Sequence, residues 1–480
     1  MEHQRKLFQQ RGYSEDLLPK TQSQRAWKTF NYFTLWMGSV HNVPNYVMVG
    51  GFFILGLSTF SIMLAIILSA FFIAAVMVLN GAAGSKYGVP FAMILRASYG
   101  VRGALFPGLL RGGIAAIMWF GLQCYAGSLA CLILIGKIWP GFLTLGGDFT
   151  LLGLSLPGLI TFLLFWLVNV GIGFGGGKVL NKFTAILNPC IYIVFGGMAI
   201  WAISLVGIGP IFDYIPSGIQ KAENSGFLFL VVINAVVAVW AAPAVSASDF
   251  TQNAHSFREQ ALGLVVAYIL FAVAGVCIIA GASIHYGADT WNVLDIVQRW
   301  DSLFASFFAV LVILMTTIST NATGNIIPAG YQIAAIAPTK LTYKNGVLIA
   351  SIISLLICPW KLMENQDSIY LFLDIIGGML GPVIGVMMAH YFVVMRGQIN
   401  LDELYTAPGD YKYYDNGFNL TAFSVTLVAV ILSLGGKFIP FMEPLSRVSW
   451  FVGVIVAFAA YALLKKRTTA EKTGEQKTIG

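Results

Sequence analysis

Charged side chains are scarce in this sequence. Only 10% of its 480 residues are Asp, Glu, Lys or Arg, whereas 58% are hydrophobic and the mean hydropathy is +0.79. A soluble domain carries about 25% charged residues, so a water-soluble globular protein is excluded. The net charge of +7 sits largely on short segments next to apolar runs, where it orients a membrane protein. We therefore expect a chain embedded in the lipid bilayer, without a nucleic-acid partner.

The residue groupings of enzymes and metal centres are also lacking. The five cysteines show no CxxC spacing and no clustered histidines, and there is no HExxH sequence. The glycine-rich stretch GIGFGGGK at 171–178 is not followed by Ser or Thr and follows no strand, which argues against a phosphate-binding loop. We therefore expect no catalytic residue and no cofactor, and a membrane-embedded enzyme is disfavoured.

Twelve apolar segments are present, most of them long enough to cross a bilayer. A helix rises about 1.5 Å per residue, so roughly 17 to 25 residues span about 30 Å of hydrocarbon. The segments are 32–57, 60–80, 107–136, 157–175, 184–207, 226–250, 262–284, 303–335, 346–360, 368–395, 420–436 and 448–464. They predict an all-α polytopic membrane protein with 12 transmembrane helices.

The distribution of Lys and Arg predicts the orientation of these helices. Loops and tails on the side of the termini hold 21 of the 28 basic residues, the opposite loops hold six, and Arg111 falls inside a span. Because cytoplasmic loops are enriched in Lys and Arg, both termini are predicted to be cytoplasmic. The tails are 1–31 and 465–480.

Two of the predicted spans are interrupted by polar or helix-breaking residues. The first contains SVHNVPNYVMVGG at 39–51, and the span five helices later contains VWAAPAVS at 239–246, where Pro243 removes a backbone donor. Paired broken helices are typical of transporters built from two inverted repeats. We therefore predict a 5+5 inverted repeat, LeuT-like in arrangement, comprising residues 32–207 and 226–395. A linker at 396–419 and two extra helices within 420–464 follow.

Polar side chains of two further spans are expected to face the same cavity. Trp119 and Gln123 lie on one face of the third span, and Asn321 and Asn325 on one face of the eighth. Indole faces favour a flat ring, and carboxamides favour a neutral ligand with N–H and C=O groups. No charged residue lies on these faces, so a ureide or nucleobase fits better than a zwitterionic amino acid, although helix dipoles could hold a carboxylate.

Each of these residues also has a simpler interpretation. Tryptophans of membrane proteins commonly form interfacial belts, and amides inside spans commonly bond one helix to another. Pro44 could be a mere kink and His41 a polar residue satisfied within the unwound segment. A passive channel is a further alternative to a transporter, and accumulation of substrate against its gradient would exclude it.

Six longer motifs occur along the chain, namely NVPNYVMVGG, RASYGVRGALFPGLLRG, WFGLQ, WAAPAVSASDFTQNA, TNATGNIIPA and FLDIIGGMLGPVIGV. They resemble those of the nucleobase:cation symporter family 1, and within it the bacterial members that take up allantoin. The resemblance covers nearly the whole chain. It implies a secondary active transporter of the bacterial inner membrane that imports allantoin by alternating access and functions as a monomer. Purine or pyrimidine bases and hydantoins are the alternative substrates.

The resemblance also implies roles for individual residues. Trp119 and Trp240 would hold the heterocycle between them, and Gln123 and Asn325 would bond its edge. The further contacts would come from Asn321, Asn42 and the backbone of Val239 to Ala242.

A coupling ion is implied as well. A sodium site would be formed by the carbonyls of Gly38, His41 and Thr316 and the hydroxyls of Ser319 and Thr320. Hydroxyls inside spans often bond only to their own helix, so this assignment is open. If protons rather than sodium drive uptake, His41 is the candidate coupling residue, because it adjoins the proposed site.

Overall fold

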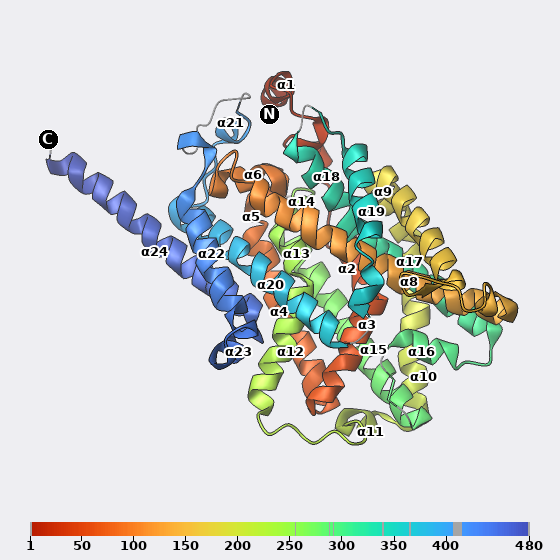
Figure 1. Cartoon of the computed structure of the whole chain (residues 1–480). Helices are drawn as coiled ribbons and strands as arrows, with labels where there is room; N and C mark the ends of the chain where they lie inside the picture. Colours follow the sequence, from red (N-terminus) through yellow and green to blue (C-terminus); the bar gives the residue numbers. More distant parts are fainter. Residues whose placement is uncertain are drawn as a thin grey trace.

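The computed structural model describes the backbone of residues 2–478, apart from 255, 288, 291, 338–339, 364–365 and 407–414. The described residues form helices joined by short connections and one antiparallel hairpin of β1 (Thr150–Leu151) with β2 (Leu154–Ser155). Both termini lie toward the same end of the helix assembly (Figure 1), and we call this end the N-terminal face.

One group of helices packs around α15, which contacts α2 and α4, while α4 also contacts α12 and α13. The group comprises the first and sixth predicted spans, each in pieces, together with the second and seventh. Its members are α2 (Thr29–Val40), α3 (Val43–Phe52), α4 (Thr59–Asn80), α12 (Ser225–Val239), α13 (Ala241–Val245), α14 (Ala247–Thr251) and α15 (Phe257–Tyr286). We call these helices the first helix group.

A second group packs around α8, which contacts α9, α17 and α19. In two of its helices, π-helical segments interrupt the α-helical pattern: η4 precedes α8, and η7 separates α17 from α18. The members are η4 (Leu109–Ala115), α8 (Ala116–Ile138), α9 (Leu156–Ile191), α17 (Leu303–Asn321), η7 (Ala322–Ile326), α18 (Ile327–Ile336) and α19 (Tyr343–Leu356). We call these the second helix group.

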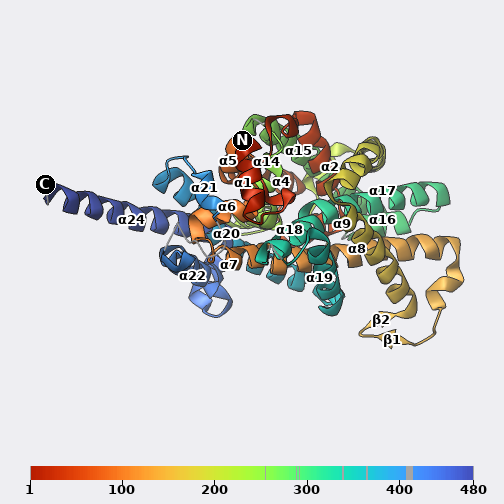
Figure 2. The same cartoon turned by 90° about the horizontal axis from the view of Figure 1, so that it is seen from above.

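The C-terminal helices form a separate set, in which α20 (Gln366–Ala389), α22 (Leu420–Leu434) and α24 (Ser449–Thr478) pack on one another. Helix α24 extends through the predicted tail to Thr478 and projects from the body in both views (Figure 1, Figure 2). The remaining short helices are α1 (Glu2–Gln10), α5 (Ala82–Tyr87), α6 (Phe91–Tyr99), α7 (Leu105–Gly108), α10 (Gly197–Val206), α11 (Ile208–Asp213), α16 (Val293–Gln298), α21 (Leu401–Leu404) and α23 (Glu443–Ser446).

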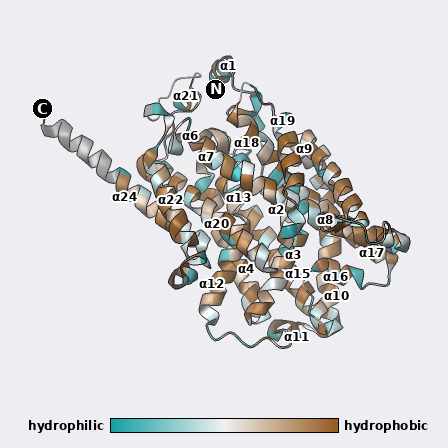
Figure 3. Cartoon of the chain, in the orientation of Figure 1, coloured by the Kyte–Doolittle hydropathy of each residue, from teal (hydrophilic) through white to brown (hydrophobic). Residues whose placement is uncertain are grey.

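Eight helices of the described residues are long and apolar enough to cross a membrane, and their positions match eight predicted spans. They are Thr59–Asn80, Leu105–Ile138, Leu156–Gly176, Ile186–Val206, Phe257–Tyr286, Leu303–Ile336, Leu371–Val394 and Leu420–Lys437. The other four predicted spans are the two broken helices, the shorter α19, and α24, which is bent by 86° from a preceding helical piece. Hydrophobic residues follow the helices of the body, and hydrophilic ones gather toward its ends (Figure 3).

The first break has a clear local cause. The backbone leaves the helical region at His41 (φ −88°, ψ 68°) and Asn42 (φ −125°, ψ 160°). The Asn42 side chain accepts a hydrogen bond from the Asn45 N–H at 3.1 Å, and Pro44 occupies the first turn, so α3 begins as a new capped helix. The predicted interruption of the first span is therefore confirmed.

The second break lies on both sides of Pro243. Helix α12 ends at Trp240 (φ −94°, ψ 3°), the short α13 contains the proline, and Ser246 (φ −92°, ψ 29°) separates α13 from α14. The sixth span thus consists of three pieces, which confirms the predicted second break.

The N-terminal segment is a folded part of the protein, whereas the sequence indicated only a tail. Tyr13, Leu17 and Leu18 are buried, and the Tyr405 hydroxyl bonds to the Leu17 carbonyl at 2.5 Å. Arg25 donates to backbone carbonyls of Ser85 and Ala254. Apolar residues spaced through this segment cover the N-terminal face, so hydrophobic burial orders it.

Candidate functional site

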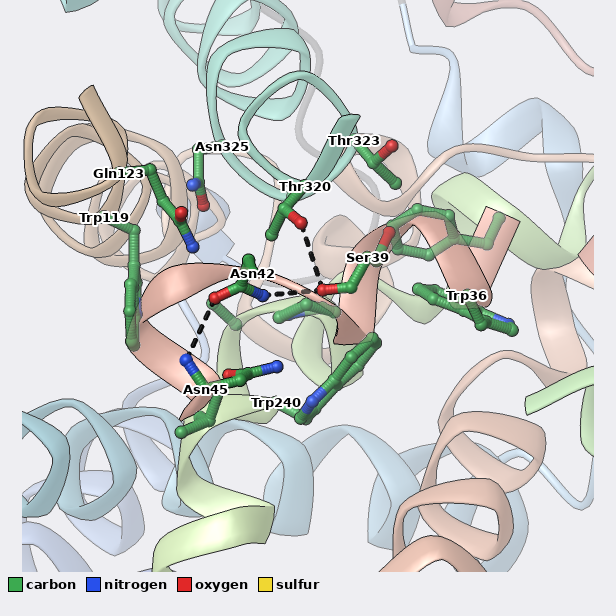
Figure 4. A pocket seen from close by; sticks show the side chains of 15 residues that line it. Trp36, Ser39, Asn42, Asn45, Trp119, Gln123, Trp240, Thr320, Thr323 and Asn325 are labelled. Atoms are coloured by element: carbon green, nitrogen blue, oxygen red, sulfur yellow. Dashed lines mark hydrogen bonds between the residues drawn. The ribbon is translucent and has the colours of Figure 1, made fainter. Parts of the chain in front are cut away.

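A cavity lies between the two helix groups, where both broken helices meet α8 and η7. Its volume is about 40 Å³, measured as the space open to the centres of water-sized spheres. This space is small, so a bound ring would contact the walls closely. Figure 4 shows side chains from these separate helices arranged around Asn42. The lining residues are Trp36, Ser39, Asn42, Asn45, Trp119, Gln123, Val239, Trp240, Ala242, Pro243, Phe250, Thr320, Thr323, Gly324 and Asn325.

Seven of the eight predicted substrate residues line this cavity. Helix α8 brings Trp119 and Gln123, the second break brings Val239, Trp240 and Ala242, the first break brings Asn42, and η7 brings Asn325. The structure therefore places residues that are far apart in sequence around one space. Their contact with a substrate stays a prediction.

Asn321 is the exception, because it is not among the lining residues. Its amide nitrogen donates to Phe120 O at 3.2 Å and to Asn169 Oδ1 at 3.1 Å, and its oxygen accepts from Asn325 Nδ2 at 2.9 Å. The side chain is fully buried among helices α8 and α9. Asn321 thus orients Asn325 instead of facing the cavity.

Sequence reasoning did not predict eight of the residues that line the cavity, namely Trp36, Ser39, Asn45, Pro243, Phe250, Thr320, Thr323 and Gly324. Thr320 was predicted only as an ion ligand. Trp36 and Asn45 lie within one helical turn or so of the first break, as Pro243 lies at the second. Distance from the breaks was therefore a usable signal for these residues.

Several polar atoms of the cavity wall are buried and lack a hydrogen-bond partner. They are Nε1 of Trp36, Trp119 and Trp240, Oε1 of Gln123 and Oγ1 of Thr323. No acidic, basic or histidine side chain is among the lining residues in the part of the chain that the structure describes. Because buried polar groups are normally paired, these indole donors, an amide acceptor and a hydroxyl suit a small neutral ligand with both donors and acceptors.

Aromatic rings close the cavity on two sides. The Trp36 ring lies 5.0 Å from the Trp240 ring and 5.0 Å from the Phe250 ring, measured between centroids. On the other side, Phe372 of α20 packs edge-on against Trp119 at 5.1 Å. These contacts keep the indoles in fixed orientations, as edge-to-face pairs do.

Oxygen atoms of the predicted ion site gather next to the cavity. The Thr320 hydroxyl donates to Thr316 O at 2.9 Å and is 3.3 Å from Gly38 O. It is also 3.0 Å from Ser39 O, a carbonyl that the sequence did not indicate. The Ser319 hydroxyl is buried without a partner, and a Cβ at Gly38 would lie 2.8 Å from it. Uncharged hydroxyl and carbonyl oxygens suit a hard monovalent cation.

The side chain of His41 does not line the cavity. Its ring stacks on Phe195 at 4.6 Å, and Nδ1 hydrogen-bonds the Tyr46 hydroxyl at 2.9 Å. The backbone turn at the break directs the side chain into this aromatic cluster. The His41 ring therefore packs outside the cavity that its neighbour Asn42 lines, and its role in proton coupling stays a prediction.

The fold and the uncharged cavity between paired broken helices define a membrane transporter that moves a small solute. Residues 19–453 match the family of permeases for cytosine/purines, uracil, thiamine and allantoin. The chain belongs to this family, which is also called nucleobase:cation symporter family 1, and it is therefore a secondary transporter and not an enzyme.

Relatives support this membership along the whole chain. A permease of Escherichia coli (strain K12) is 98% identical over 484 aligned positions, which cover 100% of both chains. The allantoin permease of Bacillus subtilis (strain 168) is 38% identical, over 94% of this chain and 93% of its own.

Solved structures share the fold. Mhp1, a nucleobase-cation-symport-1 family transporter in a closed conformation with bromovinylhydantoin bound, has a TM-score of 0.75 and 23% identity, over 96% of each chain. A Na+-coupled sialic acid symporter has a TM-score of 0.52 and 15% identity, over 91% of this chain and 96% of that one. The predicted LeuT-like fold class is thereby confirmed, while the count of twelve helices stays a prediction.

Proposed function

We propose that this chain imports allantoin by alternating access. The observation that carries the proposal is the set of unpaired indole, amide and hydroxyl groups in a tight, uncharged cavity. Allantoin is a neutral hydantoin ring with a ureido arm, so it presents N–H and C=O groups to such a wall and a flat face to the indoles.

The relatives favour the same substrate. Proteins named allantoin permease occur in Bacillus subtilis at 38% identity and in Saccharomyces cerevisiae at 25% identity. The Escherichia coli relative, at 98% identity, is also named for allantoin. In our proposal Trp119 and Trp240 stack on the ring, and Gln123 and Asn325 bond its edge. Asn42 and the backbone of Val239 and Ala242 contribute further polar contacts, and Asn321 acts through Asn325.

Sodium is the proposed co-transported ion. It would bind the oxygens of Gly38, His41, Thr316, Ser319 and Thr320, with Ser39 as an added carbonyl. The unpaired Ser319 hydroxyl supports this assignment, because a buried hydroxyl without a partner has a free acceptor. Ser39 O also accepts from Asn42 Nδ2 at 2.7 Å, so ion and substrate would share one segment and stabilise each other there. Protons are the alternative coupling ion.

The membrane setting follows from the charge distribution. The loops and tails on the side of the termini hold 21 of 28 basic residues, which supports placing the N-terminal face in the cytoplasm and the chain in the bacterial inner membrane. The cavity lies within a single chain, which supports function as a monomer.

Initial rates of radiolabelled allantoin uptake test these proposals. Cells that make the protein are compared at matched ionic strength with and without sodium, and with and without a protonophore. Sodium-stimulated accumulation is expected. Sodium-independent accumulation that collapses with the protonophore would overturn the sodium proposal but keep the allantoin proposal.

Competition defines the substrate class. Unlabelled uracil, cytosine, hypoxanthine and hydantoin are added in excess to the same assay. The fused or flat rings of the bases also suit stacking between indoles, so a nucleobase or hydantoin transporter is the second candidate. Absence of allantoin uptake in well-expressed protein, together with uptake of one of these compounds, would replace the proposed substrate.

A further inference from the structure

Arg111 is a fully buried cation next to the cavity, with 0% of its surface exposed. It lies in η4, and its guanidinium donates through Nε to Ser246 Oγ at 3.1 Å and through one terminal nitrogen to Gly324 O at 2.8 Å. Gly324 lines the cavity, and Ser246 Oγ in turn donates to the carbonyl of Ala242, another lining residue, at 3.3 Å. Arg111 thus touches the cavity wall from behind.

The two partners of Arg111 belong to different helix groups. Segment η4 packs tightly on α18, since a Cβ at Gly112 would lie 2.3 Å from Gln332 Cβ. Arg111 and Gly324 therefore move with the second helix group. Ser246 joins α13 to α14, which pack on α4 in the first group. The bond from Arg111 to Ser246 consequently crosses between the groups that alternating access must displace.

The pairing of these buried groups is incomplete. The second terminal nitrogen of Arg111, Nη1, is buried without a partner. Asp249 lies one helical turn beyond Ser246. Its Oδ1 accepts a hydrogen bond from the Phe91 N–H at 2.8 Å, whereas its Oδ2 is buried without a partner. Among the described residues, Arg111 and Asp249 form no ion pair with each other.

Asp249 lies on the side of the N-terminal face. Asn253, one further turn along the chain, contacts Lys20, and its carbonyl accepts the Trp27 N–H at 2.9 Å. A shift of η4 relative to α14 by about one helical turn, about 5.4 Å, would carry a guanidinium from Ser246 toward Asp249. Leaving both charges unpaired in every state would be costly, so a state that joins them is expected.

We propose that Arg111 is a two-position clasp between the helix groups. In the state described by the structure it bonds to Ser246 and holds the N-terminal side of the cavity closed. When that side opens, it releases Ser246 and pairs with Asp249. Arg111 is a positioning residue in this proposal, which rests on the proposed transport function but not on the identity of the substrate.

A reporter cysteine tests the proposal without any substrate. Thr323→Cys places a thiol in the cavity wall, and a membrane-impermeant maleimide is applied from the side that labels Gln9→Cys in the exposed α1. Labelling of the parent, with its five native cysteines, gives the background. The rate of Thr323→Cys labelling then measures opening at the N-terminal face.

Three mild substitutions are compared in the reporter protein. Ser246→Ala removes the closed-state partner and should raise the labelling rate about ten-fold, the size expected for a hydrogen bond to a charged group. Asp249→Asn keeps an oxygen for the Phe91 N–H but removes the charge, and it should lower the rate severalfold. Ser248→Ala, on the same helix, removes a buried hydroxyl that has no partner and should change nothing.

Opposite shifts for Ser246→Ala and Asp249→Asn are the result that supports the clasp. Shifts of the same sign, a rate in Ser246→Ala equal to that of the parent, or an equal shift in Ser248→Ala would each overturn it. Opposite shifts in a protein that does not take up allantoin would contradict only the proposed substrate.

Discussion

Gln123→Leu should separate substrate binding from folding stability. Gln123 is 2% exposed, and its Oε1 is buried without a hydrogen-bond partner in the protein. Replacing the amide with a leucine of similar shape removes a buried, unpaired acceptor. The substitution is therefore expected to leave the folded protein equally stable or more stable, while a substrate N–H that Gln123 would accept loses its partner.

The magnitudes follow from the cost of an unpaired group. A buried polar atom without a partner costs about 1–3 kcal/mol, so the free energy of unfolding should rise by up to about that amount. When substrate binds to the variant, the substrate N–H that Gln123 would accept is buried without a partner, and binding is weakened by the same amount. At 1.4 kcal/mol per ten-fold, the dissociation constant should rise roughly five-fold to more than a hundred-fold.

Purified protein in detergent allows both quantities to be measured. Thermal unfolding reports stability, and binding of labelled allantoin reports affinity. Gln260→Leu is the matched control, because Gln260 is 1% exposed, both of its side-chain polar atoms are unpaired, and it lies outside the cavity lining. It should stabilise the protein without changing affinity. A Gln123→Leu variant with parental affinity, or one that unfolds more easily, would refute the reasoning.

Three further predictions concern the cavity and the ion. Trp119→Ala and Trp240→Ala should each abolish allantoin binding at normal membrane expression, because the stacking surface is lost; uptake by both variants at the parental rate would contradict the stacking arrangement. Thr320→Ala should reduce the stimulation of uptake by sodium, measured as the ratio of rates with and without the ion, and an unchanged ratio would count against the ion site. His41→Gln should leave the response to a protonophore as in the parent, because the ring packs among aromatic side chains away from the cavity.

The breaks were predictable from the sequence because they have strong local causes. A proline and an asparagine cap within an apolar run indicate an interruption whatever the tertiary structure. A second proline-containing interruption five spans later indicates the symmetry. The i, i+4 pair Trp119 and Gln123 was likewise predictable, since α8 is a regular helix there.

The same spacing brings Asn321 and Asn325 together, since their side chains are hydrogen-bonded at 2.9 Å, but only Asn325 lines the cavity. Asn321 also bonds to Phe120 O of α8 and to Asn169 of α9, and these partners hold its amide behind the cavity wall. Asn321 consequently points into the packing between α17, α8 and α9 while Asn325 reaches the cavity. Sequence periodicity predicts which face of a helix a residue occupies, but it does not predict which residue of that face reaches the cavity.

The direction of the His41 side chain was also beyond prediction. The residue lies in the break, where neither helical nor strand periodicity applies, and the tertiary packing of Phe195 and Tyr46 decides where the ring goes. Phe250 was missed for a related reason, since the sequence gives no sign that its ring packs against Trp36 at the cavity.

Unpaired buried polar atoms connect the cavity with the transport cycle. Among the described residues, such atoms belong to Trp119, Trp240, Gln123 and Thr323 at the cavity and to Arg111 and Asp249 at its N-terminal side. Each raises the free energy of the state in which it is unpaired. A ligand can shift a conformational equilibrium only by its difference in affinity between states. A substrate would supply such a difference if it paired the cavity atoms in one state, while a helix displacement paired Arg111 with Asp249 in the other.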